Sequence, residues 1–149
     1  MLRELGKNEE AMASLLRAEQ LNPHNRMTQC ELGAVLVTME RFADAETRFR
    51  KVLSVPVKSI DHPLMTACAQ NGLAACIVKL YGATAEAEDL LRKALTVLSG
   101  DAAMWFRLTE VCAGLGKDAE ARKALAKVVE LTPGTALAEY AERLLANQA

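Results

Sequence analysis

The residues of this chain that could perform acid, base or nucleophilic chemistry are few, and their spacing is unfavourable. Its two histidines, His24 and His62, each lie beside a proline. Ser59 and Asp61 precede His62, so the residue types of a hydrolase triad occur within one turn. A triad needs its members brought together by the fold around an oxyanion hole, and neighbours in one turn are not oriented that way. We interpret these residues as capping and turn residues, and we expect neither an enzyme nor a cofactor.

The cysteines also lack the spacing of a reactive or metal-binding site. Cys30, Cys68, Cys76 and Cys112 form no Cys-x-x-Cys pair and have no pair of histidines nearby. Zinc sites and thioredoxin-like sites need closely spaced ligands of this kind. We therefore expect four buried thiols and no metal site.

Charge and hydropathy argue against two further classes of partner. The 149 residues include 18 basic and 19 acidic side chains, so the formal net charge is −1. Nucleic-acid binding depends on an excess of positive charge that this chain lacks. The apolar stretch from Gly33 to Met39 is too short to span a bilayer, and Arg3 and Glu4 interrupt any secretory signal at the start. The sequence predicts a cytoplasmic protein with no nucleic-acid or membrane partner.

An internal repeat indicates the elements that position these side chains. Aromatic residues make up 4% of the chain and alanine is abundant, which favours close-packed helices over a sheet. Residues 34 apart match in two registers: Leu5 with Met39, Ala11 with Ala45 and Leu15 with Phe49, then Gly82 with Gly116, Ala87 with Ala121 and Leu91 with Leu125. Ala45 and Ala87 are 42 apart, which indicates an insertion of eight residues. A fixed period of this length is typical of a helical repeat array.

The best copy of the repeat, 102–135, resembles the tetratricopeptide repeat. It has Trp105, Leu108, Gly116, Ala121, Leu125, Val128 and Pro133 at places that this family's motif defines. The resemblance covers essentially the whole chain and implies an all-α, right-handed helical-repeat solenoid of helix-turn-helix units. It also implies a non-catalytic interaction scaffold or adaptor that binds a peptide or helix of a partner protein.

The repeats divide the chain into the parts of a single domain. These are a partial repeat at 1–25, repeats at 26–59, 68–101 and 102–135, an insertion at 60–67 and a capping helix at 136–149. First helices are expected near 26–39, 63–81 and 102–115, second helices near 9–21, 43–55, 84–98 and 118–131, and a last helix near 136–146. Asn25, Asp101 and Thr135 are expected to cap helices, and Gly6, like Gly82 and Gly116, to follow a helix end. The insertion either lengthens the next helix by about two turns, starting at Asp61 and His62, or forms a loop.

Charged pairs four residues apart mark the outward faces of the second helices. They are Glu46 with Arg50, Glu88 with Arg92, Asp89 with Lys93 and Asp118 with Arg122. We expect solvent-exposed pairs that contribute a few tenths of a kcal/mol each and carry no function.

The resemblance implies that one face of each first helix lines a concave groove. Carried over to this chain, the main groove residues are Met27, Cys30, Ala34, Val37, Ala69, Leu73, Cys76, Lys79, Phe106, Arg107 and Glu110. Met27, Leu73 and Phe106 would anchor an apolar ligand, and the charged members of the set would orient it. The other interpretation is that the chain itself or a second copy covers many of these residues.

The opening helix is expected to present an apolar edge. Leu5, Met12, Leu15 and Leu16 would face a space where a partner helix is missing. Because an exposed apolar stripe favours association, we expect a homodimer or a fragment of a longer array, with docking of another protein as the third explanation. Alternatives for the whole chain are a repeat region of a larger enzyme, for example of the glycosyltransferase type, or a secretion or pilus-assembly helper.

Overall fold

In the computed structural model, which describes residues 2–56 and 63–147, the chain is an array of eight helices. They are α1 (Leu2–Leu21), α2 (Arg26–Thr38), α3 (Phe42–Ser54), α4 (Pro63–Tyr81), α5 (Ala85–Leu95), α6 (Ala102–Gly114), α7 (Asp118–Leu131) and α8 (Ala136–Asn147). The described residues contain no strand. The all-α prediction is therefore confirmed.

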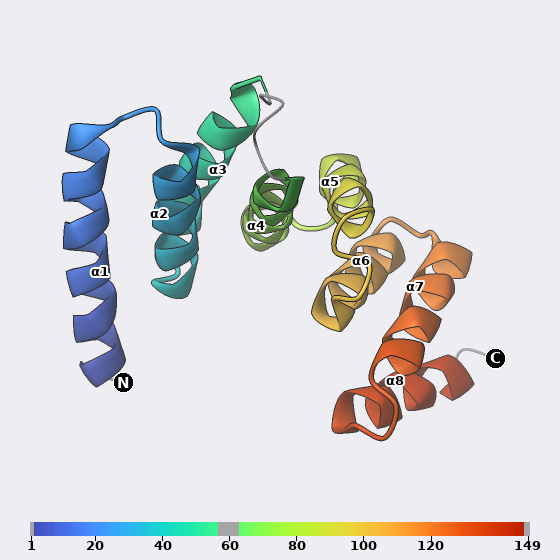
Figure 1. Ribbon diagram of the computed structural model, residues 1–149. Helices are drawn as coiled ribbons and strands as arrows, with labels where there is room; N and C mark the ends of the chain where they lie inside the picture. The colour runs from blue at the N-terminus through green and yellow to red at the C-terminus, as the bar shows by residue number, and fades with distance from the viewer. Residues whose placement is uncertain (1, 57–62, 148–149) are drawn as a thin grey trace.

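Consecutive helices pack side by side and form an arch (Figure 1). α2, α4 and α6 line its inner edge, whereas α3, α5 and α7 lie along its outer edge. The main core lies between these two layers and runs from α2 to α7. Ala45, Ala87 and Ala121 are at most 5% exposed within it, as expected where small residues let antiparallel helices cross closely. This architecture is a helical-repeat solenoid.

Polar side chains cap the starts of α2, α6 and α8. Asn25 Oδ1 accepts a hydrogen bond from the backbone N–H of Thr28 at 3.1 Å, and Asp101 Oδ1 accepts one from Met104 at 3.1 Å. Thr135 caps α8 in the same way. These bonds satisfy backbone donors that the first turn of a helix leaves without partners. The expected caps are confirmed at all three residues.

A residue in the left-handed conformation follows each inner helix. Gly82 has a φ of 84° after α4, and Gly116 has a φ of 75° after α6. Glu40 takes the same conformation after α2, with a φ of 58°, although it has a side chain. This conformation costs a residue with a Cβ about 1–2 kcal/mol. The α2–α3 turn is therefore more strained than its two counterparts.

The turn expected at Leu5 and Gly6 is wrong. Both residues lie inside α1, which runs without interruption from Leu2 to Leu21. A Cβ at Gly6 would meet no atom within 4 Å, and Gly6 does not adopt the left-handed conformation that Gly82 and Gly116 adopt. Good helix-forming residues such as Glu4 and Lys7 flank Gly6, so the helix continues through it. A glycine inside a helix costs about 1 kcal/mol relative to alanine.

The insertion lengthens α4. This helix has 19 residues, against 13 in α2 and 13 in α6. It begins at Pro63, since the fixed φ of proline suits a first helical position. Residues 63–67 are therefore helical, and the loop alternative is wrong for them. Asp61 and His62 lie outside the described residues, as does residue 60.

Two glycines allow α2, α3 and α4 to pack closely. Phe49 of α3 is 4% exposed, and its ring lies between Gly33 of α2 and Gly72 of α4. A Cβ at Gly33 would lie 2.6 Å from the ring Cζ, and one at Gly72 would lie closer still. Both distances are well inside van der Waals contact. The ring cannot move away from one glycine without approaching the other.

The cysteines differ in their burial. Cys76 and Cys112 are buried as expected and Cys30 is half-buried, but Cys68 is exposed on α4, so the prediction of a buried thiol is wrong there. Burial raises the pKa of Cys30 and of Cys76 to about 11 each. Because the thiolate is the reactive form, both thiols are unreactive at neutral pH.

Candidate functional site

A groove lies on the inner edge of the arch, where α2, α4 and α6 come together. Its volume is about 640 Å³, which is within the range of about 300–1,000 Å³ typical of ligand sites. We call it the inner groove, and the residues that line it are Val37, Thr38, Glu40, Phe42, Ala75, Val78, Lys79, Ala103, Phe106, Arg107 and Glu110. It is the candidate site of this protein.

The structure brings several predicted groove residues together there. Val37 comes from α2, Lys79 from α4, and Phe106, Arg107 and Glu110 from α6. The ring of Phe106 is half-buried and lies 6.1 Å from that of Tyr140 on α8, measured between centroids. α8 therefore helps to fix the apolar side chain at this end of the groove.

Other predicted groove residues are inaccessible. Ala69, Leu73 and Cys76 of α4 are 0%, 3% and 0% exposed, so a partner in the groove cannot touch them. Ala75 and Val78 line the groove in their place. The prediction is therefore wrong for this part of α4, including Leu73 as an anchor.

A shift of one residue in α4 explains the error. Buried residues of α4 follow buried residues of α2 at a constant distance of 41: Ala67 follows Arg26, Ala69 follows Thr28, Leu73 follows Leu32, Ala74 follows Gly33 and Ile77 follows Leu36. In the outer helices the distance is 42, from Ala45 to Ala87. The additional residue lies in the last turn of α4, since Leu36 is four residues before Glu40 whereas Ile77 is five residues before Gly82. When the repeat positions of α4 are counted back from Gly82 or Ala87, each predicted groove residue falls one residue too far toward the end of the helix.

The remaining predicted groove residues lie elsewhere. Met27 is 57% exposed but lines a separate depression with His24, Val55 and Met65. Cys30 packs against the core, and Ala34 is exposed on α2. None of the three is among the residues that line the inner groove.

The charged groups of the inner groove balance one another. Lys79 and Arg107 are opposed by Glu40 and Glu110 along its lining. Arg107 Nη1 donates to Asn71 Oδ1 at 2.5 Å, so α6 is tied to α4 beside the groove and the guanidinium is held in place. The groove combines an apolar floor with charges of both signs.

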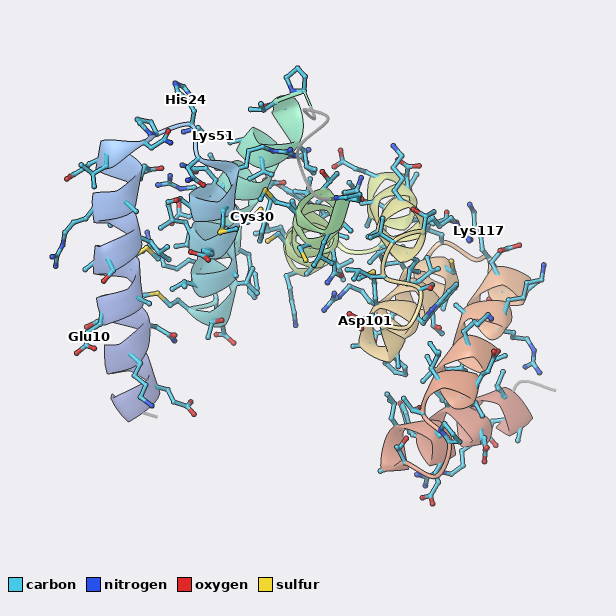
Figure 2. All side chains as sticks on the ribbon, viewed as in Figure 1. Glu10, His24, Cys30, Lys51, Asp101 and Lys117 are labelled. Carbon is cyan, nitrogen blue, oxygen red and sulfur yellow. The ribbon has the colours of Figure 1, made fainter. Side chains whose placement is uncertain are left out.

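Of the histidine, serine and aspartate residues considered for chemistry, the structure describes His24. His24 lies exposed in the α1–α2 connection, where Figure 2 shows its side chain near the top of the view, and its backbone N–H donates to Asn22 Oδ1. Ser59, Asp61 and His62 lie outside the described residues. Among the side chains that the structure describes, no three His, Cys, Asp or Glu residues are placed to share a metal ion. None of the described helices has the length and apolar character needed to cross a membrane.

The outer helices are joined by a repeated set of ion pairs. We call it the ion-pair ladder: Arg50 joins Glu46 at 3.2 Å to Glu86 at 2.8 Å, and Arg92 joins Glu88 at 2.8 Å to Glu120 at 3.1 Å. The first set links α3 to α5 and the second links α5 to α7. The expected pairs within α3 and α5 are confirmed, including Asp89 with Lys93. Arg122 instead donates to the Leu145 carbonyl at 3.1 Å, and its expected pair with Asp118 is absent from the described residues.

Glu88 is not the solvent-exposed residue that its pairing with Arg92 suggests. Its side chain is 9% exposed, and it also accepts a hydrogen bond from Lys117 Nζ at 2.6 Å. The bonds from Lys117 and then Arg92 lower the pKa of this carboxyl. Sequence spacing could not show this burial, because Lys117 comes from the next repeat.

The apolar edge of α1 is only partly exposed. Leu5 and Leu16 are 43% and 39% exposed, as expected. Met12 packs against the main core and Leu15 is half-buried, so the prediction that all four face an empty space is wrong for these two. α1 turns part of its stripe toward α2 because the two helices pack together.

Known proteins share this architecture. The crystal structure of MamA is 20% identical with a TM-score of 0.75, over 98% of this chain and 84% of that one. MamA 41-end from Desulfovibrio magneticus RS-1 is 22% identical with a TM-score of 0.76, over 97% and 75%. A chain of the APC/C hetero-tetramer Cut9-Hcn1 is 21% identical with a TM-score of 0.81, over 97% of this chain and 27% of that one. At these identities the likeness shows the fold alone.

Family comparison agrees with the structural likeness. A model of the tetratricopeptide repeat matches residues 80–147, and a second model of the same repeat matches residues 1–25. No curated protein matches the sequence.

Proposed function

We propose that this chain, which belongs to the tetratricopeptide repeat family, is a non-catalytic interaction scaffold that binds a segment of a partner protein in the inner groove. The observation that carries the proposal is the groove itself, about 640 Å³ in volume, formed where three inner helices converge. Extended peptides and amphipathic helices both bind to concave apolar surfaces of this kind.

The lining of the groove indicates the chemistry of the segment. Val37, Ala75, Val78 and Phe106 offer apolar surface from all three inner helices. Their contact with a large apolar side chain would supply most of the binding free energy, because a few buried anchors dominate such interfaces. The balanced charges along the lining favour a segment with little net charge.

A blocking substitution tests this site. Ala103 is exposed and lines the groove, so Ala103→Arg places a long charged side chain there without disturbing the core. Ala126→Arg is the matched control, because Ala126 is an exposed alanine of α7 that does not line the groove. Peptides selected from a random phage-displayed library on the wild type are then titrated by calorimetry against all three proteins.

We expect the selected peptides to bind the wild type and Ala126→Arg equally. Binding to Ala103→Arg should weaken by about tenfold or more, the factor expected when a buried apolar anchor loses its place. Peptides that bind all three proteins alike would contradict the proposal, as would a selection that enriches none.

Self-association through α1 is a second candidate function. We propose a homodimer because Leu5, Leu16 and Leu21 are 43%, 39% and 89% exposed along this helix. The wild type should show a dimeric mass by light scattering, and Leu5→Glu with Leu21→Glu should show a monomeric one. Leu80→Glu changes a 38% exposed leucine of α4 and serves as the control. A monomeric mass for the wild type at high concentration would contradict the proposal.

A further inference from the structure

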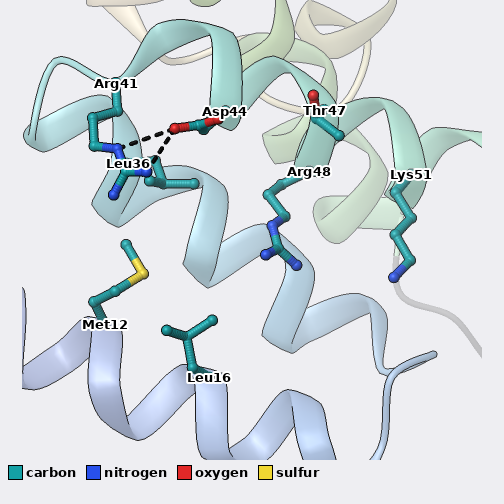
Figure 3. Close-up of a pocket in the computed structure, with 8 residues that line it drawn as sticks. All are labelled: Met12, Leu16, Leu36, Arg41, Asp44, Thr47, Arg48 and Lys51. Carbon is teal, nitrogen blue, oxygen red and sulfur yellow. Dashed lines mark hydrogen bonds and ion pairs between the residues drawn. The ribbon is translucent and has the colours of Figure 1, made fainter.

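A second pocket lies between α1, α2 and α3, away from the inner groove. Its volume is about 380 Å³. Met12 and Leu16 of α1 point into it, and Arg48 and Lys51 of α3 reach toward it from the opposite side (Figure 3). Within the described chain the backbones of α1 and α3 both pack on α2 and do not pack on each other, which leaves this space between them. We call it the α1–α3 pocket.

The pocket occurs where the ion-pair ladder is interrupted. Met12 and Leu16 precede Glu46 and Arg50 by 34 residues, so they occupy in α1 the places that the glutamate and arginine of the ladder occupy in α3. Between α3 and α5, and again between α5 and α7, these charged side chains bridge to the next outer helix. Between α1 and α3 the same places are apolar, and the ion pair that joins these two helices uses other residues, Glu19 and Arg48. The interface is therefore apolar at the two places where its counterparts carry the ladder.

The interruption also leaves positive charge at the rim of the pocket. Lys117 bridges to Glu88 on the preceding outer helix at 2.6 Å, whereas Arg41, its counterpart before α3, pairs with Asp44 of its own turn at 2.7 Å. Lys51 forms no ion pair with the described residues. Of the residues that line the pocket, three are basic and one is acidic.

Two of the three cations at the rim already have partners. Arg41 pairs with Asp44, and Arg48 of α3 pairs with Glu19 of α1, which also accepts a hydrogen bond from Gln29 at 2.6 Å. The bonds from Gln29 and then Arg48 lower the pKa of the Glu19 carboxyl. Lys51 therefore supplies the uncompensated positive charge beside the apolar floor.

We propose that the α1–α3 pocket binds an acidic peptide segment of a partner protein through one large apolar side chain. That side chain contacts Met12 and Leu16, and a carboxylate beside it in the segment faces Lys51. Charge complementarity selects the acidic segment, because the positive charge of Lys51 is not balanced by an ion pair within the described residues. The site is separate from the inner groove, whose lining charges balance, so the two sites take segments of different charge.

Short peptides of defined charge test the proposal. The probes are the hexapeptide EDLFDE, acetylated and amidated at its ends, the basic analogue KKLFKK and the analogue EDSSDE, which lacks apolar side chains. Each is added at millimolar concentration to the ¹⁵N-labelled chain, and amide chemical shifts are followed. We expect EDLFDE alone to give saturable shifts, confined to amides of α1 and α3. Equal shifts with KKLFKK, shifts mapped to α4 and α6, or no shifts with EDLFDE would overturn the proposal.

A variant that copies the chain's own ladder provides the second test. Met12→Glu combined with Leu16→Arg introduces at this interface the residue types that bridge the other two. Because Met12 packs against the core, circular dichroism and the urea midpoint check that this variant retains the fold. It should weaken EDLFDE binding by about tenfold or more, since the apolar floor is lost. Lys51→Glu, which changes an exposed side chain, should also weaken binding, whereas Ala103→Arg in the inner groove should not. Unchanged affinity in the first two variants would overturn the proposal even if the inner groove functions as proposed.

Discussion

At the scale of single residues, the backbone of Glu40 limits stability. Its φ of 58° is a conformation that Gly82 and Gly116 adopt without strain in the equivalent turns. We expect Glu40→Gly to raise the free energy of unfolding by about 1 kcal/mol, because glycine removes the clash of the Cβ. Urea denaturation measures the change. Glu40→Ala keeps the Cβ and should give no gain, so an equal gain in both variants would contradict the explanation.

The packing of Phe49 makes a second residue-scale prediction. Gly72→Ala should lower the free energy of unfolding by about 1–3 kcal/mol, the usual cost of overpacking a core. The ring cannot yield, because Gly33 lies against its other side. Gly100→Ala is the control, since a Cβ there would meet no atom within 4 Å. Denaturation midpoints that fall equally in both variants would show that the Phe49 contact is not the cause.

At the scale of elements, the sequence predicts the helices better than the faces that they present. Pro63–Tyr81 and Asp118–Leu131 begin and end at the expected residues, since proline, glycine and polar caps mark helix ends locally. The face of α4 depends on one additional residue in the last turn of this helix, between Ile77 and Gly82, which no residue type marks. The repeat pattern therefore places Leu73 in the groove and leaves out Ala75 and Val78. The burial of Glu88 depends on Lys117, a contact between repeats that local spacing does not contain.

The ion-pair ladder predicts that outer-helix packing weakens in acid. Hydrogen bonds from Lys117 and Arg92 lower the pKa of Glu88, and that from Arg50 lowers the pKa of Glu86. A carboxyl whose pKa is lower in the folded chain stabilises it above the pKa of the unfolded chain, about 4.5, and this contribution is lost as the pH falls through the folded value.

Glu88→Gln tests that dependence directly. At pH 7 the variant should be about 1 kcal/mol less stable, because its cationic partners are half-exposed and the bridge is partly screened. Below pH 4.5 the difference from the wild type should shrink, because Glu88 is protonated first in the unfolded chain and then, as the pH falls through its lowered pKa, in the folded chain as well. Denaturant midpoints between pH 7 and pH 3 follow the change. A difference that stays constant over this range would show that charge is not the cause.

At the scale of the whole molecule, stability should vary along the array. Within the described residues the backbone of α1 packs on α2 and that of α8 on α7, with side-chain contacts to α3 and to α6 respectively, whereas the backbone of α4 packs on α2, α3, α5 and α6. In a repeat array each unit is stabilised by its neighbours, so the helices at the two ends open more readily. Amide hydrogen exchange of the 149-residue chain should therefore be slowest in α4 and fastest in α1 and α8. Bridging α1 to α3 with Met12→Glu and Leu16→Arg should slow exchange in α1 selectively, because it extends the ladder by one interface. Uniform protection across all eight helices would instead show that the array opens as one unit, and that the apolar interface beside α1 does not weaken it.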